Sequence, residues 1–171
     1  MLTADHQPVR FQLGEALRTR FGASTFDKNV DAVRRNLDFD VDDEVALATL
    51  KDIDTWALEY ITTNSERLLK KQLSRSEVEN SYTPLVRVYG SSSSVKTKIN
   101  IRGSRSATLW NDNGEQILDP PTEGTWQDFS YSVYVAIPQL WIMQGTFGLL
   151  LETTALMLQA PTVTNPFAQK V

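Results

Sequence analysis

Basic and aromatic side chains recur together in the middle of the sequence, between residues 87 and 110. Basic side chains bind phosphates, aromatic faces stack on nucleobases, and single-stranded nucleic acid is typically held by both kinds of group together. Trp110 lies beside a turn, where a core tryptophan is not expected, although packing is its alternative role. We therefore predict a nucleic-acid-binding site formed by Arg87, Tyr89, Lys96, Lys98, Arg102, Arg105 and Trp110.

Charge is segregated along the chain, whose net charge is −4. Residues 27–54 contain nine acidic and four basic residues, whereas residues 67–105 contain nine basic and two acidic ones. A basic segment can create a local field that attracts a polyanion even when the whole protein is negatively charged. Alternatively, the acidic and basic segments neutralise each other within the fold.

The residues that most enzymes and metal sites need are scarce. The chain has no cysteine, which excludes disulfides, thiol nucleophiles and zinc–thiolate sites. Its one histidine, His6, lies near the N-terminus, and neither a phosphate-binding glycine loop nor a G-x-S-x-G motif is present. The segment Asp38–Glu44 lacks the glycine and the spaced glutamate of a calcium loop. We expect no enzyme activity, no catalytic residue, no metal, no cofactor and no small-molecule substrate.

A helical pattern occupies the second quarter of the chain. Three acidic residues at 42–44 favour a helix start, because negative charge is stabilised at the N-terminus of a helix. Apolar residues then recur at helical spacing to residue 61, and Ser74 with Glu77 forms a capping box for a short further helix. We predict a helical segment over about residues 42–82, with Trp56 in the core and both Asp52 and Asp54 on solvated faces.

Alternation of apolar and polar residues predicts strands elsewhere. The strand-like segments are residues 11–13, 37–41, 85–89, 95–102, 107–110, 116–118, 131–137 and 147–158. Gly90 and the four serines after it indicate a flexible loop, and Trp141 is expected in the core. Together these elements predict an α+β fold, namely an antiparallel OB-like or Greek-key barrel, with the helical segment (about 42–82) inserted before the main strands, of which roughly five to six follow it.

The length of 171 residues fits a single domain, long enough to bury a core without metals or disulfides. We predict one domain over residues 1–171, with an irregular N-terminal arm (1–10) and a C-terminal tail (161–171). No stretch approaches the roughly 18 consecutive apolar residues of a membrane span, and the polar N-terminus does not resemble a signal peptide. We therefore expect a soluble, intracellular protein with no membrane contact.

Several short motifs together resemble a known family. They are Phe26-Asp27, Asn36-Leu37-Asp38, Asp54-x-Trp56, Ser74-x-x-Glu77, Tyr82-x-Pro84, Lys96-x-Lys98-Ile99-Asn100, Trp110-x-Asp112-x-Gly114, Leu140-Trp141-Ile142-Met143 and Phe147-Gly148-Leu149. Over about residues 11–160 the chain resembles uncharacterised or single-stranded-DNA-binding proteins of large double-stranded DNA viruses of algae and protists. Its layout is similar to that of the OB-fold replication proteins of tailed phages.

This resemblance implies an OB-type barrel, a role in viral DNA replication or recombination, and no cofactor. If viral, the protein would act in the nucleus or cytoplasm of the infected cell. Phage proteins of this type often end in an acidic tail that competes with DNA, whereas residues 165–171 contain no acidic residue. Either such a tail is absent here or the acidic segment Asp38–Glu44 takes its place.

Two functions are therefore compared. The first is sequence-independent binding of single-stranded DNA in replication or recombination, with phosphates on the basic residues of the predicted site and bases on its aromatic residues. The alternative is a structural or assembly protein, such as a minor virion component, in which the basic segment pairs with residues 38–54 of a neighbouring subunit. A homo-oligomer is compatible with either function, and the position of the basic side chains in the fold discriminates between them.

Overall fold

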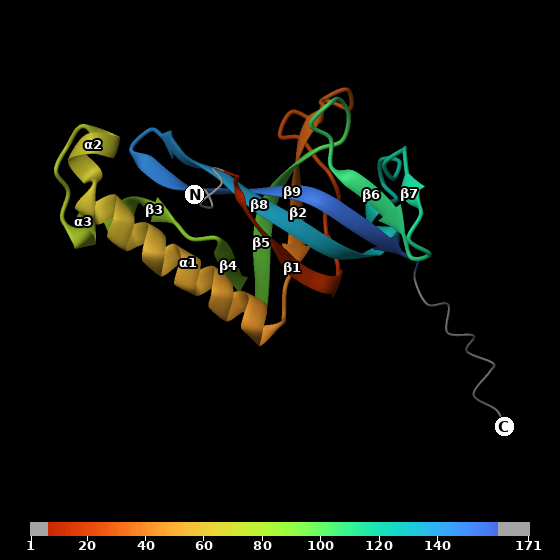
Figure 1. Ribbon diagram of the computed structural model, residues 1–171, viewed down its shortest axis with the longest axis horizontal. Helices are drawn as coiled ribbons and strands as arrows, with labels where there is room; N and C mark the ends of the chain where they lie inside the picture. The colour runs from red at the N-terminus through yellow and green to blue at the C-terminus, as the bar shows by residue number, and fades with distance from the viewer. Residues whose placement is uncertain (1–6, 161–171) are drawn as a thin grey trace.

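One curled sheet forms most of the protein, of which the computed structural model describes residues 7–160 (Figure 1). Its main path runs in the order β1-β8-β9-β5-β2. These strands are β1 (Val9–Leu17), β8 (Ser130–Met143), β9 (Thr146–Gln159), β5 (Ser92–Asn100) and β2 (Arg34–Asp40). The chain that follows β1 bridges to β2 through Arg18 with Asp40 and Ser24 with Asn36, so the two ends of the path meet.

Strand β9 is paired along both edges. On one edge it forms a long antiparallel hairpin with β8. On the other edge it pairs in parallel with β3 (Tyr82–Thr83), then with β5, and then with β6 (Thr108–Asn111). The predicted α+β class and OB-like curl are confirmed in this coarser form, but a purely antiparallel sheet is wrong. Apolar alternation indicates which face of a strand is buried and carries no information on the direction of its neighbour.

Three helices lie between β2 and β3, as the helical segment predicted. They are α1 (Glu44–Thr63), α2 (Ser65–Leu69) and α3 (Arg75–Ser81). The Asp43 side chain caps α1 by accepting a hydrogen bond from the Ala46 N–H (2.7 Å), and the predicted capping box of Ser74 and Glu77 is formed. Within residues 7–160, no helix has the length and apolar character needed to cross a membrane.

The shorter strands form two hairpins, and two segment boundaries differ from the prediction. β4 (Val86–Tyr89) pairs with β5, and β6 pairs with β7 (Gln116–Ile117) at the predicted turn. Residues 92–94 belong to β5 and not to a flexible loop, because pairing with β4 and β2 satisfies their backbone. Residues 9 and 10, expected in an irregular arm, belong to β1; residues 1–6 of that arm and the tail 161–171 lie outside the described residues.

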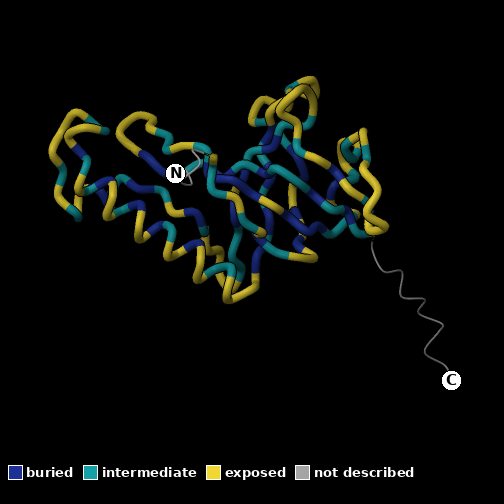
Figure 2. The backbone as a smooth tube through the Cα atoms, viewed as in Figure 1, coloured by how far each residue is buried: buried dark blue, intermediate teal, exposed yellow. Residues whose placement is uncertain are grey.

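The core lies inside the curl of the sheet and along the sheet-facing side of α1 (Figure 2). Trp126, in a short 3-10 turn, is 2 % exposed, and the buried Tyr131 hydroxyl donates to its carbonyl oxygen (2.7 Å). Gly22 lies against this indole: a Cβ there would be 2.7 Å from Trp126 Cβ, and its φ of +65° also favours glycine. Trp126 is therefore the core tryptophan, a role that the sequence analysis did not assign to it.

The two tryptophans predicted to be core are placed differently. Trp56 is 40 % exposed and stacks on Tyr60, with ring centroids 5.2 Å apart. The buried face of α1 passes instead through Asp54 and Ala57, so Trp56 lies at the margin of that face. Trp141 is only half-buried, at the outer end of β8. The prediction that both are core residues is therefore wrong for Trp56 and only partly met by Trp141.

Asp54 is buried, which corrects its expected solvated position. Its carboxylate accepts hydrogen bonds from the Tyr82 hydroxyl (2.5 Å) and from the Leu85 N–H (3.0 Å). Burial raises the pKa of Asp54, while the two hydrogen bonds favour its ionised form. The carboxylate thus ties the middle of α1 to the segment between α3 and β4. Asp52 is exposed, as predicted.

We expect Trp126→Ala to lower the free energy of unfolding by about 3–5 kcal/mol, because it removes a fully buried indole and leaves a cavity. Trp56→Ala is the matched control and should cost clearly less, since that side chain is largely in solvent. Urea denaturation followed by circular dichroism measures both changes. Equal losses in the two variants would contradict this assignment of the core.

Candidate functional site

A groove of about 550 Å³ lies on the outer side of the sheet. One wall carries four basic side chains from β2, β4 and β5: Arg34, Arg87, Lys96 and Lys98. A second wall is largely apolar and comes from the outer end of the β8–β9 hairpin, including Trp141, Ile142 and Met143. This end of the hairpin extends beyond its pairing with β1 and projects over β3 toward the side of α2 and α3 (Figure 1).

The basic wall follows from strand geometry. Side chains alternate between the faces of a strand, so Val95, Thr97 and Ile99 are buried while Lys96 and Lys98 face outward. This confirms the predicted amphipathic strand. The antiparallel register with β2 sets Asn36 beside Lys98 and residue 34 beside residue 100, and the register with β4 sets residue 87 beside residue 94. Residues paired in this way share a face of the sheet. Basic side chains from β2, β4 and β5 therefore lie close together.

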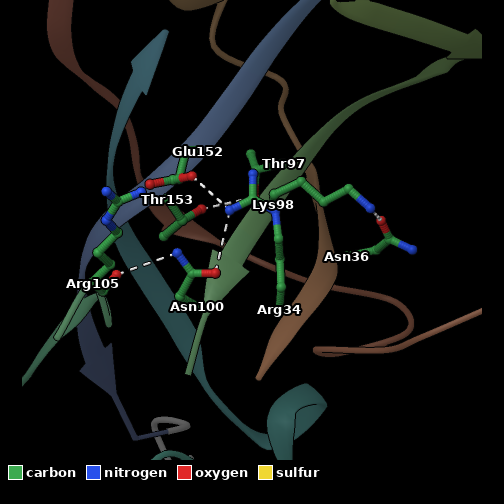
Figure 3. Close-up of polar contacts among 8 residues, drawn as sticks. All are labelled: Arg34, Asn36, Thr97, Lys98, Asn100, Arg105, Glu152 and Thr153. Atoms are coloured by element: carbon green, nitrogen blue, oxygen red, sulfur yellow. Dashed lines mark hydrogen bonds and ion pairs between the residues drawn. The ribbon is translucent and has the colours of Figure 1, made fainter. Parts of the chain in front are cut away.

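A polar network links this wall to β9 (Figure 3). The Lys98 ammonium donates to Asn36 Oδ1 (2.6 Å). The Arg34 guanidinium donates to Glu152 Oε2 (2.8 Å) and to Asn100 Oδ1 (3.3 Å). Glu152 lies on the same face as the basic side chains, because its position on β9 is in register with Lys98. Its carboxylate therefore offsets part of the positive charge of the wall.

Two pKa shifts report how closely the charges of this wall are spaced. Burial lowers the pKa of Lys98, and the neighbouring charges of Lys96 and Arg34 lower it further. Burial also raises the pKa of Asp38, against the opposing effect of Lys96, Arg87 and Lys98. Like charges that depress each other's pKa are stabilised by an incoming anion. The wall is thus suited to binding a chain of phosphates.

The predicted site residues are only partly brought together. Arg87, Lys96 and Lys98 line the groove. Arg105 is not part of the lining; its carbonyl oxygen accepts from Asn100 Nδ2 (3.3 Å) and its side chain points toward Glu152 (Figure 3).

The other three predicted residues also lie outside the groove lining. Arg102 is exposed in the loop after β5. Tyr89 is 59 % exposed at the end of β4. Trp110 is 37 % exposed on β6, beside Met157 of β9, and its indole N–H donates to Thr108 Oγ1 (3.2 Å). Their role in binding stays a prediction.

Sequence reasoning missed one basic residue and the apolar wall. Arg35 and Leu37 are buried, so the alternation of side chains along β2 turns Arg34 outward. The sequence therefore contained a signal for the outward position of Arg34. Trp141, Ile142 and Met143 form an unbroken apolar run at the end of an alternating strand, which indicated an apolar surface. Their place in the same groove as the basic side chains depends on the parallel pairing of β9 with β5, which no local pattern specifies.

The apolar wall approaches β3 closely at Gly148. A Cβ at this position would lie 2.9 Å from Trp141 Cζ2 and 3.0 Å from the Thr83 carbonyl oxygen. The indole of Trp141 and the backbone of β3 therefore meet over a residue that has no side chain. Thr83, Pro84 and Leu85 continue from this contact as part of the groove lining.

Metal chemistry has no donor cluster in the described part of the chain. Among residues 7–160, no group of three or more histidine, cysteine, aspartate or glutamate side chains could hold a metal ion. The chemistry that the groove offers is charge, hydrogen bonding and apolar contact.

Comparisons with known proteins place the fold. No family model matches the sequence, and no curated protein matches it by sequence. The structure is similar to gp2.5, a single-stranded DNA-binding protein encoded by bacteriophage T7, with a TM-score of 0.58, 11 % sequence identity, and 95 % of this chain and 96 % of that chain covered. It is also similar to the single-stranded DNA-binding protein from bacteriophage Enc34 in complex with ssDNA, with a TM-score of 0.54, 10 % identity, and 88 % and 86 % covered. The chain thus has the fold of these two phage proteins.

Proposed function

We propose that this protein binds single-stranded DNA without sequence dependence and acts in DNA replication or recombination. The observation that carries the proposal is the groove, whose lining combines four basic side chains with an apolar part that includes an indole. A single strand presents phosphates on one side and bases on the other, so it matches both walls at once. The shared fold with two phage single-stranded DNA-binding proteins supports the same function.

In this arrangement the phosphates lie along the basic wall and the bases turn toward Trp141 and Met143. Contacts to phosphates carry no sequence information, and stacking on an aromatic face tolerates every base. We propose no catalytic step, no cofactor and no small-molecule substrate.

The remaining predicted residues extend this path along the outer face of the sheet. Arg105 continues the basic wall beyond Arg34. Trp110 is in register with Met157, five residues along β9 from Glu152, which is a distance of about 17 Å in an extended strand. A longer DNA strand that leaves the groove past Arg105 would reach Trp110.

The assembly function receives less support. In that alternative the acidic segment pairs with the basic segment of another subunit. Here Asp40 pairs with Arg20 of the same chain (2.8 Å), Asp43 caps α1, and Asp54 is buried. The origin in a virus, an intracellular location and a homo-oligomeric state remain parts of the proposal that follow from the sequence resemblance and the function.

Affinity for oligo-dT should fall steeply with salt, because each neutralised phosphate releases condensed counterion. Four phosphate contacts on the basic wall give a log–log slope of about −3, at about 0.7 per contact. Fluorescence anisotropy with labelled oligo-dT measures the slope, and the matching duplex should bind more weakly. Absence of oligo-dT binding at low salt would contradict the proposed function.

Arg87→Ala should make this slope shallower by about 0.7, because one phosphate contact is lost. Lys71→Ala is the matched control: it removes one positive charge from an exposed position outside the groove and should leave the slope unchanged. Equal effects of the two substitutions would show that binding follows net charge and not the groove.

Glu152→Gln should strengthen binding, because it removes the carboxylate that pairs with Arg34. We expect a gain of roughly two- to five-fold, since a surface ion pair is worth up to about 1 kcal/mol. Glu123→Gln makes the same charge change at an exposed loop position and should have little effect. Anisotropy at constant salt compares the variants, and a weaker complex of Glu152→Gln would contradict the assigned groove.

Trp141→Ala should weaken oligo-dT binding by roughly 5- to 150-fold, the range for loss of one stacked base. Trp110→Ala should have a comparable effect only on oligonucleotides long enough to run beyond the groove. Titration of each variant with a series of oligo-dT lengths separates the two, and a thermal melt checks that each is folded. A Trp110→Ala variant that binds every length normally would assign this side chain to packing alone.

A further inference from the structure

A smaller pocket of about 230 Å³ lies beside the groove. The connection between β1 and β2 forms one side of it with residues 21–26, and β2 and β5 form the other with Asn36, Asp38 and Lys96. Lys96 lines both this pocket and the groove. A strand of DNA held in the groove, as proposed above, therefore has one of its nucleotides beside the pocket.

Two phenylalanines of this connection are turned to solvent. Phe21 is 70 % exposed and Phe26 is 102 % exposed, and both line the pocket. An apolar ring that is exposed to water is stabilised when it packs against another flat apolar surface. A nucleobase offers such a surface, and a stack of this kind is worth about 1–3 kcal/mol.

The connection that carries these rings is held in place. Ser24 and Asn36 exchange two backbone hydrogen bonds, of 2.9 and 2.7 Å. The buried Arg35 side chain donates to the carbonyl oxygens of Ala32 (3.0 Å) and Val30. The rings are therefore presented by a fixed scaffold, which lowers the entropy lost when a ligand binds.

Asp38, which lines the pocket, has a carboxylate oxygen without a partner in the described part of the chain. Its Oδ1 atom is buried and has no hydrogen-bond partner among the described residues. None of the ion pairs found within residues 7–160 includes Asp38, although Lys96 is directly opposite it in the register. An acceptor removed from water without a donor is destabilising, and a donor from a ligand would offset that cost.

We propose that this pocket takes one nucleobase with an exocyclic amino group, which stacks on Phe26 and donates a hydrogen bond to the Asp38 carboxylate. Cytosine, adenine and guanine carry such an amino group. Thymine does not, and its one ring donor, N3–H, is flanked by two carbonyl oxygens that a carboxylate repels. The inference rests on the proposed function and adds a preference to it: at one nucleotide position, the otherwise sequence-independent site favours amino-bearing bases over thymine.

The test compares oligo-dC with oligo-dT of the same length at pH 8 by fluorescence anisotropy. Both bases are pyrimidines, so stacking area is nearly constant and the amino group is the main difference. We expect the protein to bind oligo-dC roughly five-fold more tightly, the lower end of the range for a specific contact to a base edge. Equal affinities would overturn the inference.

Asp38→Asn should reduce the ratio of the two affinities to about one, because the amide can donate to the thymine oxygens. Asp40→Asn is the matched control. It removes the same charge two residues along β2, where the carboxylate pairs with Arg20 instead, and should preserve the ratio. A preference for oligo-dC that survives Asp38→Asn would exclude this carboxylate as its source.

Phe26→Ala tests the stack without risk to the fold, because the ring is fully exposed. It should weaken binding of both oligonucleotides by roughly five-fold or more. Leu118→Ala removes another exposed apolar side chain, 87 % exposed, and should change neither affinity. Unchanged affinities in Phe26→Ala would overturn the stack.

The two proposals fail in different ways. If oligo-dT binds and Arg87→Ala alters its salt slope, but Phe26→Ala and Asp38→Asn change nothing, only the base pocket is wrong. If neither oligonucleotide binds, the proposed function itself is wrong.

Discussion

Hydrogen bonding along both edges of β9 positions nearly every surface of functional interest. A strand has two edges, and β8 occupies the whole of one. β3, β5 and β6 share the other, at residues 147–148, 152–153 and 155–158. Because a shift of one residue turns every side chain to the opposite face, this register decides that Lys98, Glu152 and Trp110 all look outward. The groove is thus a consequence of pairing between strands that are far apart in the sequence.

Two carboxylates affect the groove that this pairing forms. Glu152 moderates the charge of the basic wall at its centre, through Arg34. Asp54 does not line the groove. Its hydrogen bonds with Tyr82 and the Leu85 backbone hold the segment 83–85, which forms part of the groove lining. One acidic residue therefore adjusts the electrostatics of the site and the other its shape. Neither would be recognised as functional from composition, since both lie outside the basic segment.

Local patterns predicted the local features well. The helical segment, the capping box of Ser74 and Glu77, the outward lysines of β5 and the hairpin at residues 111–114 all depend on neighbours in the sequence, and all are present. The errors arise where tertiary contacts decide. Trp56 is at the margin of a helix face whose centre is a buried aspartate, and the parallel partners of β9 are invisible to alternation. For the same reason local patterns indicated three basic residues of the groove but did not indicate Arg34 or the apolar wall.

Gly148 gives the groove a property that its charged residues cannot supply. The Trp141 indole and the Thr83 carbonyl oxygen both approach the position that a Cβ would occupy, at the point where Thr83 pairs with Gly148. Any side chain there would force the Trp141 indole or the β3 backbone to move. The fit of the indole against β3 at this end of the groove accordingly depends on the absence of one methyl group, and so on backbone geometry rather than on side-chain chemistry.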